Sequence, residues 1–132
     1  MTKTSRGTVT IPADINVWDH ELKTAQVLAR YGHRVEFVVA DNGYRIKSAD
    51  ILVDGVPYEI KSPRTDKLSA VERNLKRASH QSANIIIDSR RMSKLHDSTV
   101  QKYLLQKLRQ QKTIKKLLFV NRKHELIDIS SF

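Results

Sequence analysis

A short hairpin-forming segment constrains the fold of this chain more than any other feature. Within residues 50–61, two runs of mainly apolar residues flank the dipeptide Asp54-Gly55, which is typical of a two-residue turn between antiparallel strands. Such a turn pairs Ile51 with Tyr58. Because side chains alternate along a strand, five apolar residues share one face, which we expect to be the core side: Ile51, Val53, Val56, Tyr58 and Ile60.

The other face of the predicted hairpin carries charge. The same count places Asp50 directly opposite Glu59, with Lys61 one step along. Like charges opposed across a sheet repel each other, and a divalent cation such as Mg²⁺ would offset that repulsion. Taken alone, the pattern has an ordinary alternative, a solvent-facing strand on which Lys61 pairs with both acids.

A third carboxylate precedes this segment. Glu21 lies on a predicted helix over residues 16–31, one position before Leu22 on its buried stripe. From there it is a candidate third ligand for the same metal. The alternative is an exposed helix glutamate.

The remaining patterns predict one domain over residues 1–132, of mixed α/β class, with an irregular lead-in at 1–13. The first helix has Trp18 on its buried face. The expected order is α-β-β-β-α-β-α-β-β. Beyond the first helix and the hairpin, we expect strand 34–39, helix 69–82, strand 84–88, helix 98–111 and a hairpin of strands 114–120 and 125–129.

The charge is distributed unevenly. The chain carries a net charge of +10, and all of the excess lies in residues 67–132, which hold fifteen basic and five acidic side chains. This asymmetry favours a polyanionic partner such as nucleic acid over a solvated face or an anionic membrane. No apolar run is long enough to span a bilayer. We expect contacts to the phosphate backbone, rather than base reading, from Lys102, Lys107, Arg109, Lys112, Lys115 and Lys116.

With these residues in place, the chain resembles the PD-(D/E)xK nuclease superfamily, which has an α-β-β-β-α-β core. Asp50 and Glu59-x-Lys61 match its two motifs, and Glu21 matches a helix carboxylate found in some members. Ala49 stands where the superfamily name has proline. The resemblance implies that Asp50, Glu59 and Glu21 bind Mg²⁺, Mn²⁺ or another divalent cation, and that Lys61 assists the attacking water.

Two segments narrow the resemblance. ADILVDGVPYEIKSP and NLKRASHQSANIIID are similar to the tRNA-nuclease domain at the C-terminus of contact-dependent growth inhibition toxins, from about Trp18 to Arg90. This similarity implies a metal-dependent endoribonuclease that cleaves tRNA or other structured RNA. It also implies a bacterial toxin exported on a larger effector, active in the target-cell cytoplasm and blocked by an acidic immunity protein; outside that setting the chain would be cytoplasmic.

In such nucleases the helix after the Glu-x-Lys strand often faces the site. Here Asn74, Arg77 and Gln81 share one face of the predicted helix. Gln81 is then a candidate for contact with a metal-bound water or the scissile phosphate, and Asn74 and Arg77 for contact with nucleic acid. The alternative is a solvated face, with Gln81 at the helix end.

Three other functions stay open from the residues. One is a DNA endonuclease of the same fold, of the resolvase or repair type. Another is a non-catalytic basic module that binds nucleic acid. The third is a metal-independent ribonuclease in which His80, His124 and a carboxylate supply the general acid and base.

Overall fold

A computed structural model describes residues 7–13, 16–38 and 51–132. The helices are α1 (Asp19–Arg30), α2 (Leu68–Ser79), α3 (Asp97–Gln110) and a short 3₁₀ turn, η1 (Ile129–Ser131). The strands are β1 (Thr8–Thr10), β2 (Arg34–Phe37), β3 (Ile51–Val53), β4 (Val56–Lys61), β5 (Asn84–Asp88), β6 (Lys116–Val120) and β7 (Leu126–Asp128). Among these residues no helix is long and apolar enough to cross a membrane.

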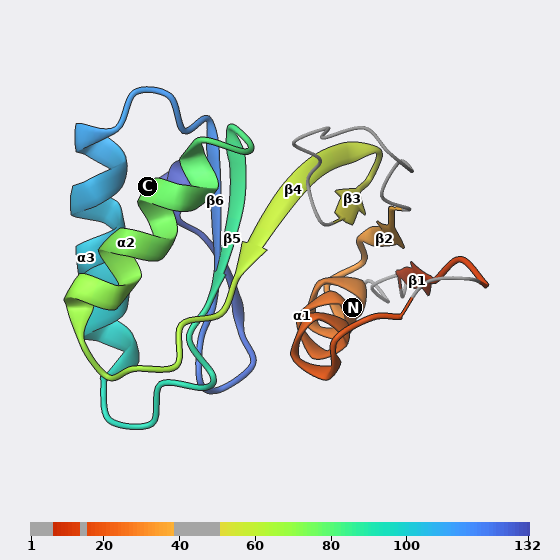
Figure 1. Cartoon of the computed structure of the whole chain (residues 1–132), viewed down its shortest axis with the longest axis horizontal. Helices are drawn as coiled ribbons and strands as arrows, with labels where there is room; N and C mark the ends of the chain where they lie inside the picture. Colours follow the sequence, from red (N-terminus) through yellow and green to blue (C-terminus); the bar gives the residue numbers. More distant parts are fainter. Residues whose placement is uncertain (1–6, 14–15, 39–50) are drawn as a thin grey trace, which may run out of the picture.

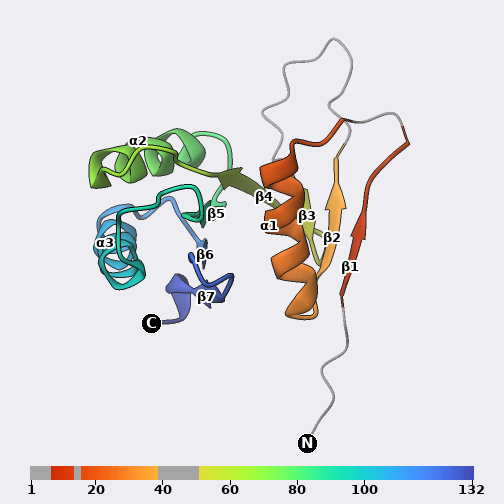
Figure 2. The same ribbon diagram turned by 90° about the horizontal axis from the view of Figure 1, so that it is seen from below.

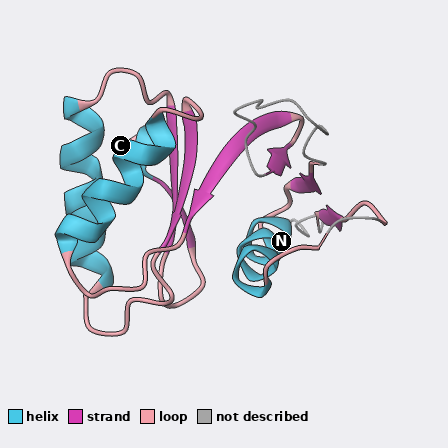
Figure 3. Ribbon diagram, in the orientation of Figure 1, coloured by secondary structure: helices cyan, strands magenta, loops and turns pink. Residues whose placement is uncertain are grey.

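The described strands form one mixed sheet in the order β1-β2-β3-β4-β5-β6-β7. β1 with β2, β4 with β5 and β5 with β6 run parallel, and the other neighbours run antiparallel. The sheet curls, so that α1 lies between β1–β3 and β5–β7, while α2 and α3 lie beyond β5 and β6 (Figures 1 and 2). The long strand β4 joins the two halves (Figure 3). The predicted mixed α/β class is confirmed.

Apolar side chains fill both faces of this sheet. α1 buries Ala25 and Leu28 against a face that includes Ile60 and Ile86. α2 and α3 cover the opposite face with a second cluster that includes Ile85, Ile87 and Phe119. Because β5 is buried on both sides, its continuous apolar run is that of a central parallel strand, and it spans the predicted residues 84–88.

The central hairpin has the predicted register. Ile51 pairs with Tyr58, and Val53 pairs with Val56. Asp54 and Gly55 at the turn have φ values of 51° and 83°, as a two-residue turn requires. Four of the five predicted core residues are buried, but Val56 is 43% exposed because it adjoins the turn.

The predicted irregular lead-in is wrong in part. Thr8–Thr10 form strand β1, which pairs with β2. Gly7 precedes it at a close approach, where a Cβ atom would overlap the backbone of His33. Gly7 N also donates a hydrogen bond of 2.7 Å to the Ala29 carbonyl oxygen. Gly7 and β1 are therefore fixed against β2 and the end of α1.

The predicted burial of Trp18 is also wrong. Its side chain is 71% exposed, because α1 begins at Asp19 and Trp18 is the residue before it. The buried stripe of α1 is centred on Thr24, Ala25 and Leu28. Helix α2 begins one residue before the predicted Ser69, and no side chain caps its first turn.

Candidate functional site

Glu59 is a buried carboxylate in the middle strand of the sheet. It pairs with Ile85 of β5 and is 4% exposed. Its neighbours Tyr58 and Ile60 belong to the α1-side cluster, so Glu59 points to the side covered by α2. Burial of a carboxylate is unfavourable unless partners compensate it. The position of Glu59 thus indicates a polar site rather than the solvent-facing strand considered above.

Two predicted site residues contact this carboxylate. Lys61 Nζ lies 3.4 Å from Glu59 Oε2, and the Lys61 side chain is 24% exposed. With the Gln81 amide oriented so that its nitrogen faces Glu59, Nε2 donates to Oε1 at 3.0 Å and also to Oε2. Gln81 itself is exposed, just beyond the end of α2. The three side chains connect a buried charge to the surface, and we refer to them as the Glu59 cluster.

The other predicted metal ligands are not placed in this cluster. Asp50 lies outside the described residues. Glu21 is half-buried in the first turn of α1, and α1 covers the opposite face of the sheet. The part of the chain that the structure describes contains no group of three or more Asp, Glu or His residues that could hold a metal ion.

The carboxylate of the Glu59 cluster is a ligand of the type that a hard cation such as Mg²⁺ takes. This ion is commonly held by one or two protein carboxylates together with water and substrate phosphate. The Lys61 ammonium is not a ligand, but it can hold a water or an anion next to one. The second carboxylate expected from the sequence, Asp50, lies outside the described residues.

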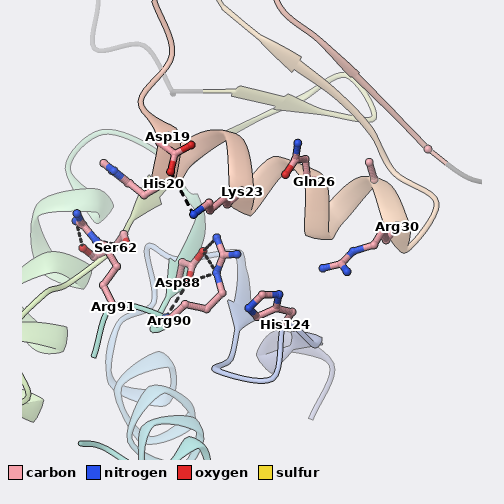
Figure 4. Close-up of a pocket in the computed structure, with 12 residues that line it drawn as sticks. Asp19, His20, Lys23, Gln26, Arg30, Ser62, Asp88, Arg90, Arg91 and His124 are labelled. Carbon is pink, nitrogen blue, oxygen red and sulfur yellow. Dashed lines mark hydrogen bonds and ion pairs between the residues drawn. The ribbon is translucent and has the colours of Figure 1, made fainter. Parts of the chain in front are cut away.

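A cleft of about 1010 Å³ lies on the opposite face of the sheet, between α1 and the ends of β4 and β5 (Figure 4). His20 and His124 line it, and Figure 4 shows them separated along the cleft. The charged side chains among the described lining residues are Lys23, Arg30, Arg90 and Arg91, against Asp19 and Asp88. The excess of positive over negative side chains favours binding of an anion in this cleft.

A buried ion pair forms the floor of the cleft. Asp88 is 1% exposed and accepts hydrogen bonds from Arg90 Nε at 2.9 Å and Nη2 at 2.7 Å. The hydroxyl of Thr24, a buried residue of α1, also donates to Asp88. Because these bonds join α1 to the end of β5, they fix the spacing of the two walls.

The neighbouring arginine has no carboxylate partner among its described contacts. Arg91 donates from Nε to Ser62 Oγ at 3.1 Å and from Nη2 to the Ser62 carbonyl oxygen at 2.6 Å. Burial lowers its pKa, and the positive charge of Arg64 lowers it further. Burial also lowers the pKa of His20, with a further contribution from Arg91. Positive groups therefore gather here with incomplete compensation.

Comparison with known proteins identifies the family. Residues 47–126, more than half of the chain, match the model of the contact-dependent growth inhibition CdiA C-terminal domain. The chain belongs to this CdiA C-terminal domain family. The matched segment contains the Glu59 cluster, Asp88, Arg90 and Arg91, whereas α1 precedes it. The toxin class that the resemblance implied is thereby confirmed at the level of the family.

A solved structure is similar in fold. The CdiA-CT/CdiI toxin and immunity complex from Burkholderia pseudomallei has a chain that superimposes with a TM-score of 0.61 at 15% identity. The match covers 90% of this chain and 92% of that chain. Among curated protein sequences, none matches. The PD-(D/E)xK assignment is not tested by either similarity and stays a prediction.

The residues predicted to contact nucleic acid fall into two groups in the structure: some already have partners within the protein, and the others are exposed. Two lysines have carboxylate partners: Lys107 with Glu72 and Lys116 with Asp128, at 2.7 and 2.8 Å. Asn74 donates to the Ala70 carbonyl oxygen of its own helix at 2.7 Å. The remaining predicted cations are exposed on α2, α3 and the loop before β6: Arg77, Lys102, Arg109, Lys112 and Lys115. They lie on the side of the sheet away from the cleft.

The structure does not bring together His80 and His124, the two histidines of the metal-independent alternative. His80 follows α2 and is exposed, while His124 lines the cleft on the other face of the sheet. The sequence patterns also missed Asp88, Arg90 and Arg91 as site residues. Their signal was a carboxylate at the end of a buried strand, followed after one serine by two arginines. This combination is too common to indicate a site without its partner on α1.

Proposed function

We propose that this chain is a metal-dependent endoribonuclease of the PD-(D/E)xK type that cleaves tRNA. The observation that carries the proposal is the Glu59 cluster, a buried carboxylate contacted by both Lys61 and Gln81. Charged groups brought together in this way within a sheet are typical of catalytic sites. The membership of the CdiA C-terminal domain family supports a toxic activity of this kind.

In this proposal each residue of the cluster has a separate role. Glu59 would hold Mg²⁺ or Mn²⁺ together with Asp50, whereas Glu21 is left out of this ligand set because α1 covers the opposite face of the sheet. Such an ion eases deprotonation of a bound water and neutralises charge that develops on the phosphate. Lys61 lies close enough to Glu59 to orient the attacking water and to stabilise the negative oxygens. Gln81 orients either the carboxylate or that water through its amide.

The charge of the chain supports a nucleic acid as the substrate. The net charge of +10 and the cationic cleft favour a polyanion. Exposed cations on α2 and α3 suit contacts with phosphates, which fit a structured RNA recognised by shape. The chemistry of the Glu59 cluster is the same for a DNA phosphodiester, so cleavage assays have to discriminate the two substrates.

The proposal includes delivery and a protective partner. The chain would enter a target cell as the end of a larger effector and act in the cytoplasm there. The producing cell would then need an immunity protein. The similar Burkholderia structure is of a toxin and immunity complex, and the positive charge of this chain favours an acidic partner.

The test is cleavage of total bacterial tRNA and, separately, of duplex DNA, each with Mg²⁺ and with EDTA. Glu59→Gln removes the charge with little change of shape, and Glu36→Gln is the matched control on an outer strand, with a side chain that is 41% exposed. We expect tRNA cleavage that requires the metal and falls at least about a hundredfold in Glu59→Gln, while Glu36→Gln retains it.

Three results would contradict the proposed function, and each points to a different alternative. Cleavage that survives EDTA would place the chemistry away from the Glu59 cluster. Cleavage of DNA alone would indicate the resolvase-like alternative. RNA binding without cleavage in any metal would indicate a non-catalytic module.

A further inference from the structure

Two positive or protonatable groups, His20 and Arg91, line one end of the cleft. His20 lies in the first turn of α1, Arg64 follows β4 and Arg91 follows β5. Arg64 is not a lining residue, but its positive charge lowers the pKa of both Arg91 and His20. We refer to His20, Arg64 and Arg91 as the positive cluster.

The carboxylates near this cluster are already engaged. Asp88 is held by the guanidinium of Arg90 and the hydroxyl of Thr24. Asp19 pairs with Lys23 at 3.2 Å on the exposed side of α1. Arg91 is oriented by neutral Ser62 atoms, so its direction is fixed without neutralising its charge. A cation held in place by neutral partners is ready to bind an anion through charge-assisted hydrogen bonds.

An exposed aromatic ring stands next to the same cluster. Trp18 is 71% exposed, although a large apolar side chain usually gains by burial. Its ring and that of His20 are nearly parallel, with an interplanar angle of 23° and centroids 6.4 Å apart. His20 lines the cleft, so the indole of Trp18 stands beside the mouth with most of its surface free for a planar ligand.

We propose that this end of the cleft binds one unpaired nucleotide of the RNA substrate, with a backbone phosphate at the positive cluster and its base stacked on Trp18. The inference rests on RNA being the substrate and adds to it a site on the face of the sheet away from the Glu59 cluster. Phosphate suits arginine because the guanidinium offers paired donors. Stacking on an aromatic ring is available only to a base that is not buried in a helix. The subsite therefore selects a loop or a single-stranded end.

An acidic segment of an immunity protein is the other natural occupant of a cationic cleft. It would satisfy the arginines equally well, but it gives no reason for an exposed indole beside them. The combination of cations with a planar apolar surface favours a nucleotide.

Trp18 is the sole tryptophan of the chain, so intrinsic tryptophan fluorescence reports on the proposed stacking surface directly. The probe is a 2′-O-methyl RNA hexanucleotide, added in EDTA so that binding is observed without turnover. We expect saturable quenching of the emission. Arg91→Ala should raise Kd about tenfold, the loss expected for one charge-assisted contact. The matched control is Arg34→Ala, an exposed arginine on β2, which should leave Kd unchanged.

Anisotropy of a labelled hexanucleotide tests the ring itself. Trp18→Leu should weaken binding about tenfold and Trp18→Phe should retain most of it, because a base can stack on either aromatic ring. Circular dichroism establishes that each variant is folded, and Arg91→Gln replaces Arg91→Ala if that variant is not.

Two results would overturn the inference: RNA binding that leaves the Trp18 emission unchanged, or equal Kd values for Arg91→Ala and Arg34→Ala. Quenching by the immunity protein but not by RNA would also overturn it and assign the cleft to that protein. None of these readouts requires cleavage, so a failure of the proposed nuclease activity is detected separately.

Discussion

Breaking the buried pair Asp88–Arg90 should lower the free energy of unfolding strongly. The burial of the two side chains indicates how large the loss should be. The two side chains are 1% and 13% exposed, and Thr24 of α1 donates to the same carboxylate. Removal of one partner of a buried pair leaves an uncompensated charge and costs about 3–5 kcal/mol. Arg90→Ala leaves Asp88 buried, so we expect a loss of about 3 kcal/mol, at the lower end because Thr24 still donates.

The two halves of the pair should not be equivalent. Asp88→Ala leaves Arg90, which borders the cleft and can reach water, so we expect a smaller loss of about 2 kcal/mol. For a domain of this size, 3 kcal/mol corresponds to a fall in Tm of about 10 °C.

Urea unfolding followed by circular dichroism measures these free energies. Lys23→Ala is the matched control, since its pair with Asp19 also lines the cleft but is 59% and 80% exposed, and it should cost less than about 0.5 kcal/mol. If Arg90→Ala costs no more than Lys23→Ala, the buried pair does not hold α1 against β5 and the reasoning fails.

Three further predictions follow from particular contacts. Lys61→Ala should lower cleavage about a hundredfold and Gln81→Ala about tenfold, each measured on protein that circular dichroism shows to be folded; equal activity to wild type in both would contradict the proposed roles. The hydrogen bond from His33, 2.7 Å from Asp54, holds the pKa of Asp54 below its usual 3.8. Its stabilisation is therefore present above about pH 4 and lost as the pH falls through the lowered pKa. Asp54→Asn, measured by thermal melts, should cost under about 1 kcal/mol at pH 7, because the side chain is 54% exposed, and nothing at pH 2; a cost independent of pH would argue against the ion pair. Gly7→Ala should destabilise the fold by about 2 kcal/mol or more, because the added Cβ would overlap the backbone of His33; an unchanged urea midpoint would show that the approach is looser.

The elements predicted correctly are those whose cause lies within a few residues. Asp54-Gly55 adopts the positive φ values that a tight hairpin needs, so the register of β3 with β4 follows from the turn. The run Asn84–Asp88 is apolar on both faces and is a central strand as predicted. The contact of Gln81 with Glu59 agrees with the predicted site, whose catalytic role and metal stay predictions.

The errors arise where distant segments decide the outcome. Strand β1 has only three residues and is stabilised by pairing with β2, about 25 positions away in sequence. Trp18 matched the helical period, yet it precedes the first helical residue and lies beside the mouth of the cleft. The apolar period identifies which face of a helix is buried. It does not identify the residue at which the helix begins or at which the rest of the protein stops covering that face.

The sequence alone determined the hairpin, the central strand and the placing of Glu59 and Lys61 on one side of β4, because turn geometry and side-chain alternation are local. Only the tertiary structure decided that Thr24 donates to Asp88, 64 residues further along, and that Arg91 is oriented by Ser62. These contacts depend on how the sheet curls around α1. That curl is set by the packing of both faces at once, which is a property of the whole chain and not of any one segment.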